Sequence, residues 1–130
     1  MFLHSMSTDE KERFLELAYK LAKIDGNYAE EEEEIINNYK AELSIVDIGD
    51  TGNIDDLIDF FATRNEPVKK IVLFELYGII GADNKIEESE KDVFKKIKTK
   101  FGISEELAKQ ITEISDELRT VYDKIYNILA

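Results

Sequence analysis

The sequence contains no cysteine and only one histidine, His4. Without cysteine the chain can form no disulfide, no thiolate metal site and no thiol nucleophile, so thiol redox chemistry is excluded. With no cysteine and one histidine, the chain can form neither a Cys–His catalytic site nor a histidine pair, and no glycine-rich phosphate loop is present. We therefore expect that the protein is not an enzyme.

Proline, glycine and long apolar runs are also scarce. One proline and six glycines are spread over 130 residues without a linker-like cluster, so a single domain covering residues 1–130 is expected. The longest apolar stretch, Ile71–Ala82, is interrupted by Glu75 and is too short to span a bilayer. The first residues lack the pattern of a signal peptide. These features predict a cytoplasmic protein that does not insert into a membrane.

Basic residues are few relative to acidic ones. The chain has 17 Lys and Arg against 29 Asp and Glu, which gives a formal net charge of −12. Such a charge disfavours contact with nucleic acid or anionic lipid, because phosphate groups carry the same sign. It favours cations or basic protein surfaces as partners.

Apolar residues recur at helical spacing along most of the sequence. This periodicity predicts an all-α fold in the form of a compact bundle of five to seven helices. Ser7 and Glu10 form a capping box, Pro67 suits a first helical turn, Gly102 suits a helix end, and Ser104 suits a helix start. The fourth helix is apolar nearly all round and is expected to be the most buried. The predicted helices cover about 8–24, from Glu30 to about 43, about 54–61, about 66–80, a segment containing Val93–Phe101, and about 104–129.

Apolar residues of the last helix recur at alternating spacings of four and three over about three heptads. This pattern has two interpretations. The helix packs along its own domain, or it forms the seam of a homodimer. The seam residues are Leu107, Ile111, Ile114, Leu118, Val121, Ile125 and Ile128.

An internal repeat emerges when the chain is shifted by 58 positions. Apolar residues then align with apolar residues, Asp25 with Asp83, and Glu32 with Glu90. The match predicts a duplicated helix-loop-helix unit with a pseudo-two-fold arrangement, one copy at about 8–44 and the other at about 66–102.

The segments LAYKLAKIDGNYAEEEEEII and ELYGIIGADNKIEESEKDVF resemble the paired motif of the TerB-like tellurite-resistance family, whose relatives include the amino-terminal domain of a membrane-anchored J-domain co-chaperone. The resemblance implies an all-helical fold, no known catalysis, a role in tellurite and other stress resistance, and divalent metal binding by acidic residues. By position, those residues are Asp25, Glu32, Asp83 and Glu90. It also implies a protein partner, with a membrane-associated protein among the candidates.

This sequence departs from the family pattern at three positions. Ala29 and Glu87 stand where a small hydroxylated residue is usual, and Asn84 replaces the glycine of the motif. The second of the two metal-binding turns is therefore the less regular one.

Two interpretations of the four acidic residues remain. Carboxylate ligands suit Ca²⁺ or Mg²⁺, and four of them brought together would form a site. Alternatively, a glutamate at the third helical position caps its own helix and an aspartate before glycine caps a turn. The two functional hypotheses follow: a TerB-like stress-response accessory protein that binds a divalent cation, or a metal-independent helical domain for protein–protein interaction.

Overall fold

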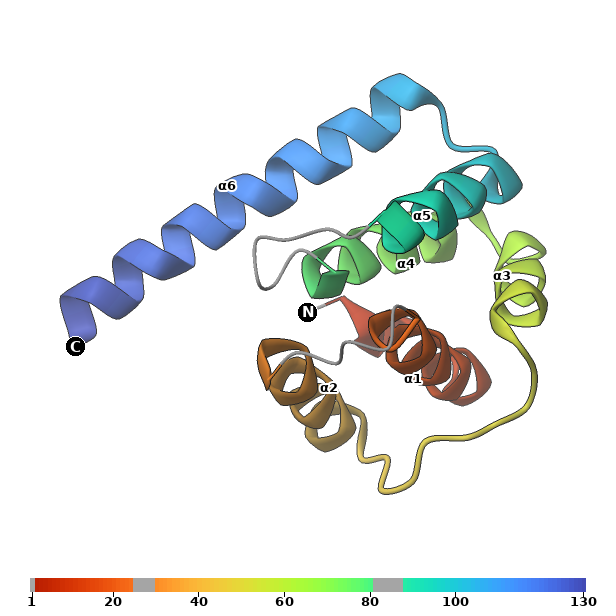
Figure 1. Ribbon diagram of the computed structural model, residues 1–130, viewed down its shortest axis with the longest axis horizontal. Helices are drawn as coiled ribbons and strands as arrows, with labels where there is room; N and C mark the ends of the chain where they lie inside the picture. Colours follow the sequence, from red (N-terminus) through yellow and green to blue (C-terminus); the bar gives the residue numbers. More distant parts are fainter. Residues whose placement is uncertain (1, 25–29, 81–87) are drawn as a thin grey trace.

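The computed structural model describes residues 2–24, 30–80 and 88–130 of the chain. Over these ranges the protein consists of helices and connecting segments without a β-strand (Figure 1), which confirms the all-α prediction. The six α-helices also agree with the predicted five to seven. In chain order the elements are a short 3₁₀ turn η1 (Leu3–Ser5), α1 (Thr8–Ala22), α2 (Glu30–Leu43), α3 (Ile54–Ala62), α4 (Glu66–Ile80), α5 (Glu88–Phe101) and α6 (Glu105–Leu129).

Side chains cap the starts of four helices, and at α4 the Asn65 side chain accepts from the Val68 N–H at 3.0 Å. The Ser7 hydroxyl accepts from the Glu10 backbone N–H at 3.2 Å, and the Glu10 carboxylate accepts from the Ser7 N–H at 2.8 Å. Asn53 and Asp56 form the same reciprocal pair before α3. Ser104 accepts from the first turn of α6 at 3.1 Å. The capping predictions for Ser7 and Ser104 are thus confirmed, because each oxygen satisfies an N–H that the helix itself leaves free.

Two helices are followed by a residue in the left-handed backbone conformation. Gly102 closes α5 with φ +66°, as predicted, because glycine adopts this conformation at little cost. Ser44 closes α2 with φ +58°, which the sequence did not suggest. The backbone N–H of Ile45 then donates to the Lys40 carbonyl at 2.9 Å and satisfies one of the last carbonyls of α2.

Helix α1 lies at the centre of the bundle, with α2 on one side and α4 and α5 on the other (Figure 1). Eight of its 15 residues are buried. The prediction that α4 is the most buried helix is wrong, because Phe74, Tyr77 and Gly78 on one side of α4 are only half-buried. The buried residues of α4 among positions 66–79 are Val68, Val72, Leu73, Glu75, Leu76 and Ile79.

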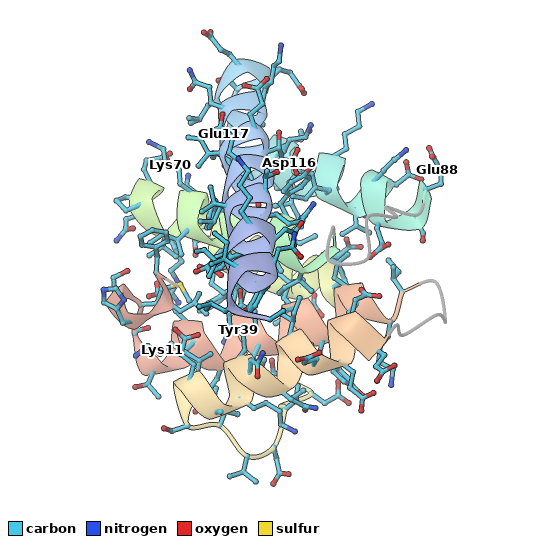
Figure 2. The ribbon with its side chains drawn as sticks, turned by 90° about the vertical axis from the view of Figure 1, so that its left-hand side faces the viewer. Lys11, Tyr39, Lys70, Glu88, Asp116 and Glu117 are labelled. Carbon is cyan, nitrogen blue, oxygen red and sulfur yellow. The ribbon has the colours of Figure 1, made fainter. Side chains whose placement is uncertain are left out.

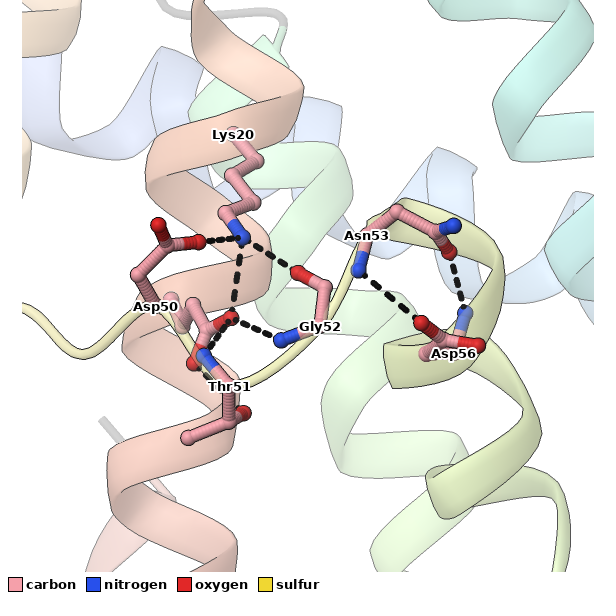
Figure 3. Close-up of polar contacts among 7 residues, drawn as sticks. Lys20, Asp50, Thr51, Gly52, Asn53 and Asp56 are labelled. Atoms are coloured by element: carbon pink, nitrogen blue, oxygen red, sulfur yellow. Dashed lines mark hydrogen bonds and ion pairs between the residues drawn. The ribbon is translucent and has the colours of Figure 1, made fainter.

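The segment 44–53 between α2 and α3 is fastened to α1 through the buried carboxylate of Glu16 (Figure 3). Glu16 accepts from the Thr51 N–H and hydroxyl, each at 2.9 Å, and from the Gly52 N–H at 3.2 Å. Lys20 lies 3.0 Å from Glu16 and 2.7 Å from Asp50, and also donates to the Gly52 carbonyl. Burial by itself raises the pKa of Glu16, but the bonds from Lys20, Thr51 and Gly52 outweigh it and hold the pKa below its ordinary value.

Helix α6 packs against the bundle only over its first half. It packs mainly on α4, where the Tyr77 hydroxyl donates to the Asp116 carboxylate at 3.2 Å. At its start, Glu105 lies 3.5 Å from Lys98 of α5. Every residue from 121 to 130 is exposed, and the helix extends beyond the other helices toward the C-terminus (Figure 1). The predicted seam is therefore divided: it packs along the domain at Leu107 and Ile111, and it is exposed at Ile114 and from Val121 onward.

Helices α1 and α2 pack against each other, and so do α4 and α5. These are the two helix pairs of the predicted repeat, and their pseudo-two-fold relation stays a prediction. Over residues 2–24, 30–80 and 88–130, none of the helices combines the length and apolarity needed to cross a bilayer.

Candidate functional site

A groove of about 650 Å³ lies between α2, α4 and α6. It forms because α6 diverges from the bundle and leaves one side of α4 uncovered next to α2. Figure 2 shows Tyr39 of α2 facing the region below the C-terminal end of α6. The lining residues are Ile35, Asn38, Tyr39 and Glu42 of α2, Phe74, Glu75 and Gly78 of α4, and Ser115, Leu118, Arg119, Tyr122, Asp123 and Tyr126 of α6.

Six of the 13 residues that line the groove are aliphatic or aromatic. Phe74 packs edge to face on Phe2, with ring centroids 5.8 Å apart, and this contact fixes its ring in the wall. Tyr122 and Tyr126 stack one turn apart on α6 at 6.4 Å and are exposed. Exposed tyrosines with an apolar ring and a polar hydroxyl are typical of surfaces that bind other proteins.

Gly78 leaves a gap in the α4 wall. A Cβ atom placed on this residue meets no atom within 4 Å, so the space next to it is open. Glycine inside a helix costs roughly 0.5–1 kcal/mol relative to alanine. The sequence therefore keeps a destabilising residue at the place where a side chain would narrow the groove.

The groove also contains a buried carboxylate, that of Glu75. It accepts a hydrogen bond from the Tyr39 hydroxyl on α2, and its other oxygen accepts from the Phe2 backbone N–H at 3.1 Å. Burial and the neighbouring Glu75 charge both raise the pKa of Tyr39, so the phenol stays protonated and remains a donor. These bonds tie η1, α2 and α4 together and fix the shape of the groove.

The charged residues that line the groove are mostly acidic. Glu42, Glu75 and Asp123 carry negative charge, and Arg119 is the one base among the lining residues. Arg119 itself lies 3.5 Å from Asp116, which partly neutralises it. An apolar groove with this balance of charge favours a ligand that is apolar on one side and basic at its edges.

Sequence reasoning did not find this groove. Its residues come from three helices that are distant in the chain, so no local pattern brings them together. Two features of the sequence could have indicated it. The first is the pair Tyr122 and Tyr126, which lie four residues apart on one face of the last helix. Gly78, near the C-terminal end of a helix with a long apolar stretch, was a second indication.

The structure describes half of the predicted metal ligands. Glu32 is the third residue of α2 and 4% exposed, and Glu90 is the third residue of α5 and 3% exposed. Asp25 and Asp83 lie outside the described residues, as do Ala29, Asn84 and Glu87. Over the described ranges, no three His, Asp or Glu side chains are grouped so that they could hold a metal ion.

Comparisons with protein-family models, with curated proteins and with solved structures found no match to this chain.

Proposed function

We propose that the protein is a non-enzymatic interaction domain whose groove binds an amphipathic helix of a partner protein. The observation that carries this proposal is the groove itself, which joins apolar walls to an acidic lining. Its α2 and α4 walls come from helices that pack against each other, so this part of the site is formed before the partner arrives.

A helix is the partner element that best fits the walls. Such a helix presents apolar side chains at spacings of three and four, and helix-in-groove recognition uses this pattern. Ile35, Phe74 and Leu118 provide apolar contacts from the three helices that line the groove. The open space beside Gly78 admits one large side chain of the partner.

Charge determines which amphipathic helices are favoured. The chain carries a net charge of −12, and Glu42 and Asp123 lie among the groove residues. Basic residues next to the apolar stripe of the partner would be attracted before contact and would pair with these carboxylates after it. A partner helix with acidic edges would be repelled.

A model peptide tests the proposal. The probe is a helical peptide of leucine and lysine with leucine at helical spacing, and the control has the same composition with leucine and lysine alternating. We expect the helical probe to bind with micromolar affinity, measured by fluorescence anisotropy, and the control to bind far more weakly.

The variants Gly78→Leu and Gly78→Ala form a matched pair for the same assay. Leucine at position 78 fills the open space and should abolish binding, whereas alanine stabilises the helix and should preserve most of it. Binding of both peptides with equal affinity would show that charge alone attracts them. Unchanged binding by Gly78→Leu would place the site elsewhere, and either result refutes the proposal.

We propose as a second function that the acidic residues Asp25, Glu32, Asp83 and Glu90 bind Ca²⁺ or Mg²⁺, as the TerB-like resemblance implies. The supporting observation is that Glu32 and Glu90 occupy the same position in their helices and are both buried. In this proposal a cytoplasmic stress-response protein changes its partner binding when the cation is bound.

A thermal shift assay separates a specific site from general screening. A cation that binds only the folded protein adds about 2.7 kcal/mol at a hundredfold excess over Kd. The melting temperature should therefore rise with Ca²⁺ or Mg²⁺ beyond the rise in sodium chloride of equal ionic strength. The difference should vanish when Asp25, Glu32, Asp83 and Glu90 are all made neutral. If sodium chloride produces the whole shift, the four acids are structural caps.

A further inference from the structure

We propose that the protein forms a homodimer through the exposed apolar part of α6, defined by Ile114, Val121, Ile125 and Ile128. These four side chains are between 41% and 82% exposed. With about 100° per residue, they fall within roughly 60° of each other around the helix and form one stripe. We call this stripe the α6 seam.

The exposed apolar area of the seam matches the largest apolar patch of a typical monomer. The seam residues and the neighbouring Leu129 are five exposed apolar residues on one side of α6. Their exposed fractions correspond to on the order of 500 Å², if a fully exposed side chain of this size presents about 150–250 Å². The largest apolar patch of a typical monomer covers roughly 300–600 Å² and often has a function. A standard interface buries about 800 Å² on each partner, so these residues would form the apolar core of such an interface.

A second copy of the chain is the occupant that the seam fits. Seam residues recur at spacings of seven and of four and three, the repeat with which one helix packs into an identical helix. A two-fold dimer uses the same patch on both copies, so one self-complementary stripe is sufficient. A basic partner has little to pair with here, because between Ile114 and Ile128 the stripe itself is apolar.

The charges beside the seam favour an antiparallel pair. Glu117 and Lys124 flank it on the same side of the helix, and Figure 2 shows Glu117 on α6 on the side away from Asp116. In a parallel dimer each residue would lie level with its own copy, and Glu117 would lie level with Glu117. An antiparallel dimer with its two-fold axis near Val121 brings Glu117 next to Lys124 of the partner subunit, and it does so twice.

The α6 seam and the groove meet at Leu118, which lines the groove and lies within about 40° of Ile114 and Ile125 around the helix. The groove residues Ser115, Arg119, Tyr122 and Tyr126 centre about 120° around the helix from the seam. A dimer through the seam therefore leaves most of the groove open on each copy. Failure of one proposal does not imply failure of the other.

Sedimentation equilibrium of the full chain tests the dimer. We expect the mass of the wild type to rise from one to two copies of the 15.0 kDa chain as its concentration increases through the micromolar range. The variant Ile125→Glu should remain a monomer, because it places a charge in the seam. The control Asn127→Glu adds the same charge on the far side of α6 and should dimerise like the wild type.

A charge exchange tests the orientation and does not depend on the Ile125 variant remaining folded. Glu117→Lys creates two repulsive contacts in the antiparallel dimer and should raise its dissociation constant about tenfold. Adding Lys124→Glu should restore the wild-type dissociation constant, because positions 117 and 124 then carry opposite charges again. Residues 117 and 124 lie seven positions apart, too far for a pair within one helix. A wild type that stays monomeric overturns the proposal. A dimer that is weakened neither by Ile125→Glu nor by Glu117→Lys would also overturn it. The same holds if the double variant Glu117→Lys with Lys124→Glu does not restore the wild-type dissociation constant.

Discussion

Replacing Glu16 tests how the segment 44–53 is fastened to α1. In Glu16→Ala the N–H groups of Thr51 and Gly52 lose their acceptor, and the Lys20 ammonium loses its nearest buried counter-charge. Removing one partner from a buried charge-assisted set costs about 3–5 kcal/mol. Glu16→Gln retains one carbonyl acceptor of the same shape, so its cost should be only about 1–2 kcal/mol.

The pH dependence of the stability of the same variants tests the contribution of the Glu16 charge. The pKa of Glu16 is lower in the folded protein than its ordinary value of 4.5. A lowered pKa contributes stability that is present above pH 4.5 and lost as the pH falls through the folded-state pKa. The difference between wild type and Glu16→Gln should therefore be constant near pH 7 and shrink below pH 4.5.

Urea unfolding followed by circular dichroism measures both effects. Glu12→Gln is the matched control, because Glu12 is exposed on the same helix and its replacement should change stability by less than about 0.5 kcal/mol. If Glu16→Ala lowers the free energy of unfolding no more than Glu12→Gln does, the Glu16 contacts do not hold the segment 44–53. A difference between wild type and Glu16→Gln that persists unchanged at pH 3 would refute the charge argument.

Three further substitutions have defined outcomes. Tyr39→Phe removes a donor from the buried Glu75 and should cost about 1–3 kcal/mol in urea unfolding. The pKa of Tyr39 is raised in the folded state, so wild-type stability should fall as the pH rises above 10.0, and a fall of equal size in Tyr39→Phe would contradict this assignment. Gly102→Ala should lower the free energy of unfolding by about 1–2 kcal/mol, because φ is +66°, and an unchanged free energy of unfolding would exclude strain. Gly78→Ala should raise stability by about 0.5–1 kcal/mol, and a loss would show that the space beside it is filled.

Local features of the fold were predictable from sequence. The capping box at Ser7 and Glu10, the cap at Ser104 and the left-handed glycine at Gly102 all depend on residues within a few positions of each other. Helix positions followed from apolar periodicity, although α1 ends at Ala22, two residues before the predicted end. Ser44 was missed because the left-handed conformation is uncommon for residues other than glycine, asparagine and aspartate.

Features that depend on distant segments were not predictable. Glu16 was one of many glutamates, and only the folded chain brings Thr51 and Gly52 to it. The groove exists because α6 leaves the bundle after packing on α4, and periodicity predicts the apolar face of a helix but not what covers it. The same limit applied to α4, whose apolar sequence predicted deeper burial than its groove-facing side has.

The most direct measurement of the central claim is a nuclear magnetic resonance titration of the ¹⁵N-labelled protein with the helical leucine–lysine peptide. Binding in the groove predicts saturable amide shifts around Tyr39, Gly78 and Tyr122, with little change in α3 and α5. Gly78→Leu should suppress these shifts, and Gly78→Ala should retain them. Shifts that follow the acidic surface as a whole, or that persist in Gly78→Leu, would contradict the account.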